Sequence, residues 1–354
     1  MIKQGLPNVK KHKVVVLSIT YNHAKYIEET LKGFAMQQTA FPFLCCVFDD
    51  ASTDGEQDVL KRWVENHCNS EVVEVYDHPL TTILKAPDKN NTNCIYVIHL
   101  QKINTWGKAE KDDLLNYWRE QGEYIALCEG DDYWTNPLKL QKQVDFLDEN
   151  PTCQMCCSDA TILNDDKELN WTRYKKNCII PVRDVVMGGG LWIQTASLLY
   201  RKELIETDYP KCHVGDYPLQ IYAALSGGIY WFSEKQVVYR YQMGNSWTAK
   251  NNKKPFSEAR IAAWKSEIKM LKEMDVLSDY LYHGIFFNRI ATYVLNIIHD
   301  NQTHMRQLIV LFKDEVALFN RSQKLKFFLI RHRLFGVYNF LSTIKHKFNK
   351  YGKI

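Results

Sequence analysis

Short apolar runs in the first half of the chain end abruptly in polar, turn-forming residues. Three runs stand out: Val14–Ile19, Phe43–Phe48 and Tyr124–Cys128. The residues that follow them are Thr20–His23, Asp49–Gly55 and Glu129–Asp132. Continuous apolar runs of this length, bounded by turn residues, are typical of strands buried on both faces, as in parallel sheets. We therefore predict three central strands, each leading into a polar loop.

Helical spacing separates these strands. A helix is predicted from about Ala24, because Ile27 and Leu31 fall on one face, and another is predicted at about Gln57–His67. Alternating strands and helices indicate right-handed crossovers and a mostly parallel sheet, so the predicted fold class is α/β. The later predictions are strands at Val72–Tyr76, Cys94–Leu100 and Cys153–Cys157, a loop at Ala86–Asn93, a helix at Lys108–Glu120, and a helix that begins at Asn136-Pro137.

Two of the three central strands lead into adjacent aspartates. Asp49-Asp50 follows the second strand, and Asp131-Asp132 follows the third. In a parallel sheet both pairs emerge at the edge where α/β proteins bind ligands. Adjacent carboxylates repel each other unless a cation joins them, and Mg²⁺ is commonly held by one or two carboxylates together with substrate phosphates. We therefore predict a metal–diphosphate site at Asp131-Asp132; the alternative is an acidic surface turn before a helix.

Composition places the chain among folded proteins with an intracellular character. Its 354 residues are 45% hydrophobic and 24% charged, with room for one large domain and an accessory one. The ten cysteines lie mostly within apolar runs. The N-terminus has no signal-like segment, and no apolar run approaches the roughly 18 residues that span a bilayer. These features predict a cytoplasmic protein with reduced thiols.

The last third of the chain changes character. From Phe256 the apolar spacing is helical, with one stripe at Ile261–Leu271 and a second at Leu281–Ile298. Residues 321–354 hold nine Lys/Arg and no Asp/Glu. Such a basic amphipathic segment fits peripheral contact with the inner face of the cell membrane; the alternative is a helix packed on the rest of the chain. We predict an α/β domain at residues 1–255 and a helical region at residues 256–354.

Several motifs together resemble family 2 glycosyltransferases of the GT-A fold. They are Thr20-Tyr-Asn22, Phe48-Asp-Asp-Ala-Ser-Thr-Asp-Gly55, Glu129-Gly-Asp-Asp-Tyr-Trp134, Gly215-Asp-Tyr-Pro218 and Tyr239-Arg-Tyr241. The resemblance covers about two-thirds of the chain, from Lys13 to Trp247. It implies a GT-A domain with a C-terminal helical extension. It also implies inverting transfer of a sugar from a nucleotide-sugar donor, with UDP the expected nucleotide, to a hydroxyl group of a glycan or lipid-linked acceptor in surface polysaccharide synthesis.

The resemblance implies roles for residues around the nucleotide. Asp50 would accept a hydrogen bond from the uracil N–H, because a charged acceptor strengthens such a bond. Tyr21 would flank the base, within a nucleotide-binding loop that includes Thr20 and Asn22. Asp131 would lie near the ribose. The alternatives are a turn or cap role for Asp50 and a packing role for Tyr21.

Further roles concern the diphosphate. Asp132 would ligate Mn²⁺ or Mg²⁺, which bridges the two phosphates and stabilises the departing nucleoside diphosphate. Arg240 would face the diphosphate or the acceptor, with a surface ion pair as the alternative. Many relatives carry an Arg-rich stretch between the two acidic strands; here Lys108 in Asn104-Thr-Trp-Gly-Lys108 is a weak substitute.

On the acceptor side, the resemblance makes Asp216 the general base that takes the proton of the attacking hydroxyl. The alternative for Asp216 is an N-cap, because it opens a predicted helix. Trp192 and Thr195 would line the acceptor site, and core packing is the alternative for Trp192.

Two other functions compete with glycosyl transfer. A sugar-phosphate nucleotidyltransferase usually has a Gly-rich loop where this chain has Thr20–His23. A catalytically inactive nucleotide-sugar-binding module is disfavoured because Asp50, Asp132 and Asp216 occur together. A nucleic-acid partner is not expected, since no recognised motif accompanies the basic tail.

Overall fold

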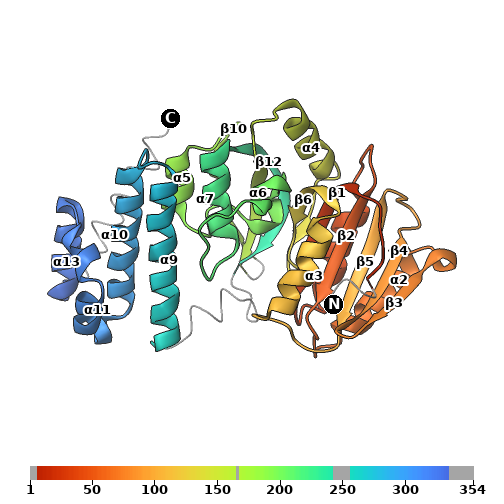
Figure 1. The fold of residues 1–354 in the computed structure, drawn as a ribbon, viewed down its shortest axis with the longest axis horizontal. Coiled ribbons are helices and arrows are strands. Elements are labelled where there is room, and N and C mark those ends of the chain that lie inside the picture. The colour runs from red at the N-terminus through yellow and green to blue at the C-terminus, as the bar shows by residue number, and fades with distance from the viewer. Residues whose placement is uncertain (1–5, 165–166, 242–255, 335–354) are drawn as a thin grey trace. The chain divides into compact units, whose positions relative to one another are not determined.

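The computed structural model describes residues 6–164, 167–241 and 256–334. These residues belong to two compact units. One unit lies within Met1–Tyr209 and Val214–Lys254, and the other within Pro210–His213 and Pro255–Ile354. The first holds the sheet, and the second consists mainly of helices (Figure 1).

The described part of the first unit forms a 12-stranded sheet in the order β10-β12-β8-β11-β6-β1-β2-β5-β4-β3, with β7 paired to β12 and β9 to β8. The strands are β1 (His12–Thr20), β2 (Phe43–Asp49), β3 (Glu74–His78), β4 (Thr81–Pro87), β5 (Cys94–Gln101), β6 (Gly122–Leu127), β7 (Tyr133–Trp134), β8 (Met155–Asn164), β9 (Lys167–Leu169), β10 (Cys178–Ile179), β11 (Leu199–Arg201) and β12 (Ile229–Arg240).

The central strands run in one direction. β1 pairs in parallel with β2 and β6, and β2 pairs in parallel with β5. β11 is antiparallel to both β6 and β8, and β8 is parallel to β12. Because two antiparallel steps restore the direction, β12 points the same way as β1, β2 and β6. Their carboxyl ends therefore meet at one edge of the sheet, and the predicted mostly parallel α/β fold is confirmed.

Helices cover both faces of this sheet. They are α1 (Ile27–Ala35), α2 (Glu56–His67), α3 (Ala109–Arg119), α4 (Lys139–Glu149), α5 (Val182–Gly188), α6 (Glu203–Glu206) and α7 (Asp216–Ser226), with short 3-10 turns η1 (Ser70–Val72) and η2 (Thr195–Ser197). One core joins Ile98 of β5 to Leu31 of α1 and Leu60 of α2. Because successive side chains of a strand point to opposite faces, His99 lies on the other face of the sheet. Its ring centroid is 5.6 Å from that of Trp118 in α3.

Three local predictions differ from the structure. The segment predicted as a strand at Val72–Tyr76 begins as η1 and becomes β3 only at Glu74. Strand β4 overlaps the predicted loop; it has no continuous apolar run because its residues alternate between buried and half-exposed. Helix α4 begins at Lys139, because Asn136 accepts the N–H of Leu138 (2.8 Å) in a turn that precedes the helix.

The second unit contains α9 (Glu258–Leu277), α10 (His283–Asp300), η3 (Gln302–His304), α11 (Met305–Leu311), α12 (Lys313–Ala317) and α13 (Arg321–Arg331). The predicted stripes are buried at Ile268 of α9 and at Val294 of α10. Leu281, in contrast, is 76% exposed and precedes α10. Among the described residues, no helix is both long and apolar enough to cross a membrane.

Candidate functional site

The end of β1 lies between the two acidic loops. The N–H of Asp50 donates to the carbonyl oxygen of Thr20 (3.0 Å), and the N–H of Gly130 donates to that of Ile19 (3.0 Å). A Cβ added at Gly130 would lie 2.1 Å from Oγ1 of Thr20, so glycine is what allows the acidic loop to approach so closely. The structure therefore brings both predicted Asp-Asp loops to one strand end.

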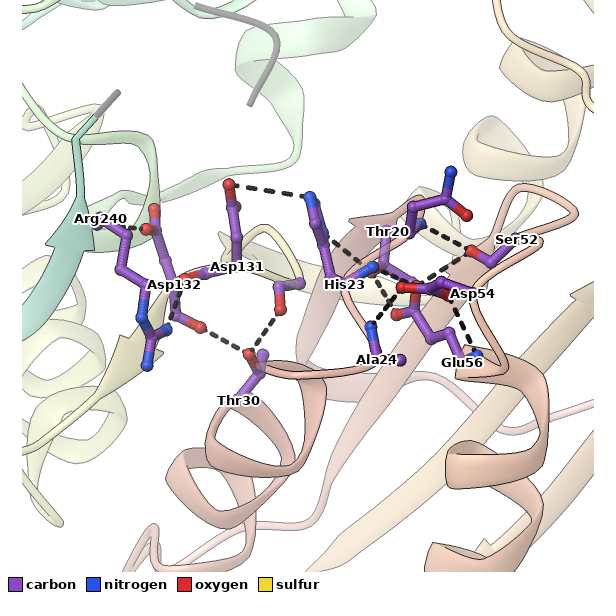
Figure 2. Close-up of polar contacts among 12 residues, drawn as sticks. Thr20, His23, Ala24, Thr30, Ser52, Asp54, Glu56, Asp131, Asp132 and Arg240 are labelled. Carbon is purple, nitrogen blue, oxygen red and sulfur yellow. Dashed lines mark hydrogen bonds and ion pairs between the residues drawn. The ribbon is translucent and has the colours of Figure 1, made fainter. Parts of the chain in front are cut away.

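A buried glutamate that the motifs did not single out ties these loops together. Glu56 accepts a hydrogen bond from the hydroxyl of Thr20 through Oε1. Its Oε2 accepts the N–H of His23 (2.8 Å) and the hydroxyl of Ser52 (2.9 Å) (Figure 2). Burial raises the pKa of Glu56 to about 7, against the opposing effect of these hydrogen bonds. Glu56 thus joins the loop after β1 to the loop after β2.

The ring of His23 extends this network to the second acidic loop. Its Nδ1 lies 3.1 Å from Oγ1 of Thr20, and its Nε2 lies 3.8 Å from Oδ2 of Asp131 (Figure 2). Neither His23 nor Glu56 was among the predicted site residues. The available signal was their position, directly after Asn22 and directly after Gly55.

Tyr21 and Asn22 have different environments within the same loop. Asn22 has a left-handed backbone (φ 59°), its N–H donates to Oγ of Ser52 (2.9 Å), and its Oδ1 accepts the N–H of Thr53 (2.8 Å). Asn22 therefore holds the loop in shape. The Tyr21 side chain is 38% exposed beside it, which leaves room for contact with a ligand.

Asp50 is buried and held by the segment that follows β5. Its Oδ1 accepts the N–H (2.6 Å) and the hydroxyl (2.8 Å) of Thr105, while its carbonyl oxygen accepts from Nδ2 of Asn104 (3.0 Å). Thr105 was not predicted as a site residue, although its segment was noted as replacing the Arg-rich stretch of many relatives.

Two lysines at the start of α3 differ in burial. Lys108 is exposed at the start of α3. Lys111, one turn later, is half-buried, with Nζ 3.8 Å from the ring centroid of Trp106. Burial lowers the pKa of Lys111, and the carboxylates of Asp50 and Glu129 oppose that shift. Lys111 therefore lies within electrostatic reach of both acidic loops.

Asp132 is fixed from two sides. Its Oδ1 accepts the N–H of Arg240 (2.9 Å), and its carbonyl oxygen accepts from the hydroxyl of Thr30 (2.6 Å) (Figure 2). Burial, together with the charges of Asp131 and Glu129, raises the pKa of Asp132. The end of β12 thus holds the carboxyl group of Asp132, and α1 holds its backbone, at the sheet edge.

The guanidinium of Arg240 is enclosed by protein groups. It lies 4.7 Å from the ring centroids of both Tyr26 and Tyr133. Nη1 donates to the carbonyl oxygen of Asp131 (2.5 Å), and Nη2 pairs with Glu29. In this structure Arg240 holds the acidic loop.

Asp216 is the first residue of α7 and not its N-cap, which is Gly215 and makes no side-chain capping bond. Oδ1 of Asp216 accepts the N–H of Tyr217 (2.8 Å), and Oδ2 accepts the hydroxyl of Thr195 (3.0 Å). Burial raises the pKa of Asp216 despite both bonds. Burial, with the charges of Asp131 and Asp216, raises the pKa of Glu129 to about 8.

Trp192 is half-buried beside Arg173, whose Cζ lies 4.4 Å from the ring centroid. Gly188 makes room for it, since a Cβ there would lie 2.4 Å from Cγ of Trp192. These contacts are those of a packed side chain. Of the two predicted acceptor-side residues, Thr195 is the one that forms a hydrogen bond with Asp216.

The carboxylates fit a cation that shares its ligands with a substrate. Among the described residues, no group of three or more His, Cys, Asp or Glu side chains is arranged to hold a metal by itself. Asp131 and Asp132 are adjacent, and their mutual repulsion contributes to the raised pKa of Asp132. Hard divalent cations are often held by one or two carboxylates with phosphate oxygens completing the shell. The donor set is therefore suited to Mn²⁺ or Mg²⁺ accompanied by a diphosphate.

Comparisons with known sequences point to one family. Residues 15–81 match the family described as Glycosyl transferase family 2. An uncharacterised protein of Mycobacterium tuberculosis (strain ATCC 25618 / H37Rv) is 32% identical over 292 residues, which cover 80% of this chain and 74% of that protein. TuaG of Bacillus subtilis (strain 168), a putative teichuronic acid biosynthesis glycosyltransferase, is 27% identical over 139 residues, 39% of this chain and 43% of TuaG.

A solved structure shares the fold. S. aureus TarS 1–349 in complex with UDP-GlcNAc matches with a TM-score of 0.58 at 16% identity, over 92% of this chain and 89% of that chain. The longer S. aureus TarS structure matches with a TM-score of 0.55, and the match covers 54% of that chain. At this identity the likeness concerns the fold alone.

Proposed function

Because the chain belongs to glycosyl transferase family 2 and has the GT-A fold, we propose that it transfers a sugar from a UDP-linked donor to a hydroxyl group, with inversion at the anomeric carbon. The observation that carries the proposal is that the loops bearing Asp50 and Asp132 meet at the end of β1. Asp216, whose charge influences the pKa of Glu129 in the second of these loops, is the acid that we propose as the general base. The UDP-GlcNAc bound by TarS supports a UDP-linked donor. The description of TuaG as a putative teichuronic acid biosynthesis glycosyltransferase supports a role in glycan synthesis, and a glycan or lipid-linked acceptor in surface polysaccharide synthesis is part of the proposal.

In the proposed reaction, Asp216 accepts the proton of the acceptor hydroxyl as that oxygen forms a bond to the anomeric carbon. The bond between the anomeric carbon and the phosphate oxygen breaks, and UDP leaves with the electron pair. Attack opposite the leaving group inverts the anomeric configuration. Thr195 would orient Asp216 through its hydrogen bond. Trp192 would line the acceptor side of the site.

The donor would be held by residues of both acidic loops. Asp50 would accept the uracil N–H, Tyr21 would flank the base, and Asp131 would lie near the ribose. Asp132, together with Asp131, would hold Mn²⁺ or Mg²⁺, which when bound supplies positive charge against the departing diphosphate. Lys111 adds a cation of the protein's own, and we assign it the donor-side role first expected of Lys108.

A screen of nucleotide sugars tests this function. UDP release, measured with glycan and lipid-linked acceptors, should occur with a UDP-linked donor and require a divalent cation. A nucleotidyltransferase would release pyrophosphate from a nucleoside triphosphate, and an inactive binding module would bind UDP without turnover. Either result would contradict the proposal.

Thr195→Val is expected to move the acidic limb of the kcat/KM pH profile to higher pH. The Thr195 hydroxyl donates to Asp216 and so favours its ionised form, which is the form that accepts a proton. Removing this donor raises the pKa of Asp216 further, and activity is then lost at a higher pH as the pH falls. Thr195→Ser keeps the hydroxyl and should leave the profile unchanged. An unshifted profile in Thr195→Val would exclude Asp216 as the group that limits activity in acid.

We further propose that residues 1–255 carry catalysis and that residues 256–354 contact an anionic membrane surface through α13. Exposed α13 residues recur at three- and four-residue spacing: Arg321, Lys324, Leu325, Phe328 and Arg331. Apolar and cationic side chains on one helical face suit an interface with anionic lipids. The predicted segment continues through residues 335–354, which lie outside the described residues.

Replacing Leu325 and Phe328 of the full chain with Asp should lower binding to phosphatidylserine-containing phosphatidylcholine vesicles by roughly tenfold or more, because two apolar side chains no longer enter the bilayer. Vesicle flotation measures this. Val310→Asp, at another exposed apolar position of the same unit (73% exposed), is the control and should bind normally. If the wild-type protein and both variants floated equally with the vesicles, α13 would not be the membrane contact.

A further inference from the structure

The two carboxylate oxygens of Asp50 are not equivalent. Oδ1 accepts both the N–H (2.6 Å) and the hydroxyl (2.8 Å) of Thr105, which occupies both of its lone pairs. In the described part of the chain, Oδ2 makes no hydrogen bond, although Asp50 is only 3% exposed. One oxygen is thus committed to the protein, and the other remains as an acceptor.

Thr105 is itself held in place. It is 1% exposed, and its carbonyl oxygen accepts the N–H of Lys108 (3.0 Å) at the start of α3. The preceding residue, Asn104, donates from Nδ2 to the carbonyl oxygen of Asp50 (3.0 Å). Turning the Asp50 carboxylate would break two hydrogen bonds in a buried position, so its orientation is fixed.

We propose that Thr105 is a specificity-determining positioning residue that makes Asp50 a single acceptor and thereby selects uracil over guanine and cytosine. The inference rests on the proposed function, in which Asp50 faces the base. Uracil offers one imide N–H, which lies between two carbonyl groups. A single carboxylate oxygen is enough to accept this N–H. Guanine offers a ring N–H beside an amino group, and this pair is best met by both oxygens of a carboxylate. Cytosine presents a ring nitrogen lone pair at the position of the imide N–H, and that lone pair is repelled by a carboxylate.

Asp50→Asn turns this geometry into a test. The backbone N–H of Thr105 can only donate, so the amide is expected to direct Oδ1 to Thr105, where it also accepts from the hydroxyl, and to direct its NH₂ group to the base. An NH₂ group repels the imide N–H of uracil and donates to the ring nitrogen of cytosine. Calorimetry of the full chain with UDP and CDP should therefore show UDP binding weakened about tenfold or more and the preference reversed in favour of CDP.

Second-site changes at Thr105 separate orientation from simple loss of charge. Thr105→Ser keeps both donors, so Asp50→Asn/Thr105→Ser should still prefer CDP. Thr105→Val removes the hydroxyl, one of the two bonds that orient the amide, while the backbone N–H remains. The amide can then flip more easily, so Asp50→Asn/Thr105→Val should recover part of its UDP affinity. Far-UV circular dichroism and thermal melting confirm that each variant is folded before titration.

The outcomes distinguish the inference from the function on which it rests. Wild-type protein that prefers UDP, with an Asp50→Asn variant that also prefers UDP, would overturn the role of Thr105 and leave the transferase proposal intact. Wild-type protein that binds GDP or CDP as tightly as UDP would also overturn selection by a single acceptor. Wild-type protein that binds none of the three nucleotides would overturn both proposals.

Discussion

Asp216→Asn is expected to lower kcat by roughly 10²- to 10⁴-fold, the usual contribution of a general base, while UDP binding stays unchanged. The amide cannot accept the proton of the attacking hydroxyl. Its shape is tolerated, because Oδ1 can still accept the N–H of Tyr217 while the NH₂ group donates to the hydroxyl oxygen of Thr195. Single-turnover assays with saturating donor and acceptor measure the chemical step, and calorimetry measures UDP binding.

Asp208→Asn is the matched control for this variant. Asp208 is an exposed acid in the segment that precedes α7, and its replacement should leave kcat unchanged. If Asp216→Asn kept wild-type turnover, another group would have to accept the proton and the mechanism proposed here would be wrong.

Asp132→Asn should weaken UDP binding by about 100-fold in the presence of Mn²⁺ and have little effect in its absence. Even outer-shell changes at metal sites typically reduce metal affinity 10- to 100-fold, and loss of a carboxylate ligand should cost at least as much. The asparagine oxygen can still accept the N–H of Arg240, so the end of β12 keeps its contact with the acidic loop. Calorimetry with UDP, with and without Mn²⁺, measures the difference.

Asp145→Asn, at an exposed acid of α4, serves as the control and should retain metal-dependent UDP binding. Wild-type affinity in Asp132→Asn with Mn²⁺ present would show that the cation is held elsewhere or is not used.

The central strands could be predicted because burial on both faces leaves a direct trace in the sequence. The sequences of β1, β2 and β6 each contain a continuous apolar run. Both boundaries of each strand lie within one or two residues of the predicted ones. The antiparallel strand β4 leaves no such run, because only alternate residues are fully buried. Strand direction then implied that the two Asp-Asp loops share an edge, and the structure places both loops beside the end of β1.

The side chains that hold the site could not be predicted from local pattern. Thr20 and Glu56 are 36 positions apart, and Asp50 and Thr105 are 55 positions apart. Such contacts depend on how loops meet after the sheet has formed, so neither helical nor strand periodicity reports them. Lys111 was missed for a related reason, since its proximity to both acidic loops depends on how α3 packs on the sheet.

The most direct test of the central claim is the anomalous scattering of manganese in a crystal of the wild-type protein grown with UDP and Mn²⁺. We predict one strong peak between the carboxylate of Asp132 and the diphosphate, with the uracil against Asp50 at the same sheet edge. A nucleotide and manganese bound away from this edge, or a nucleotide there with no manganese beside Asp132, would contradict the account.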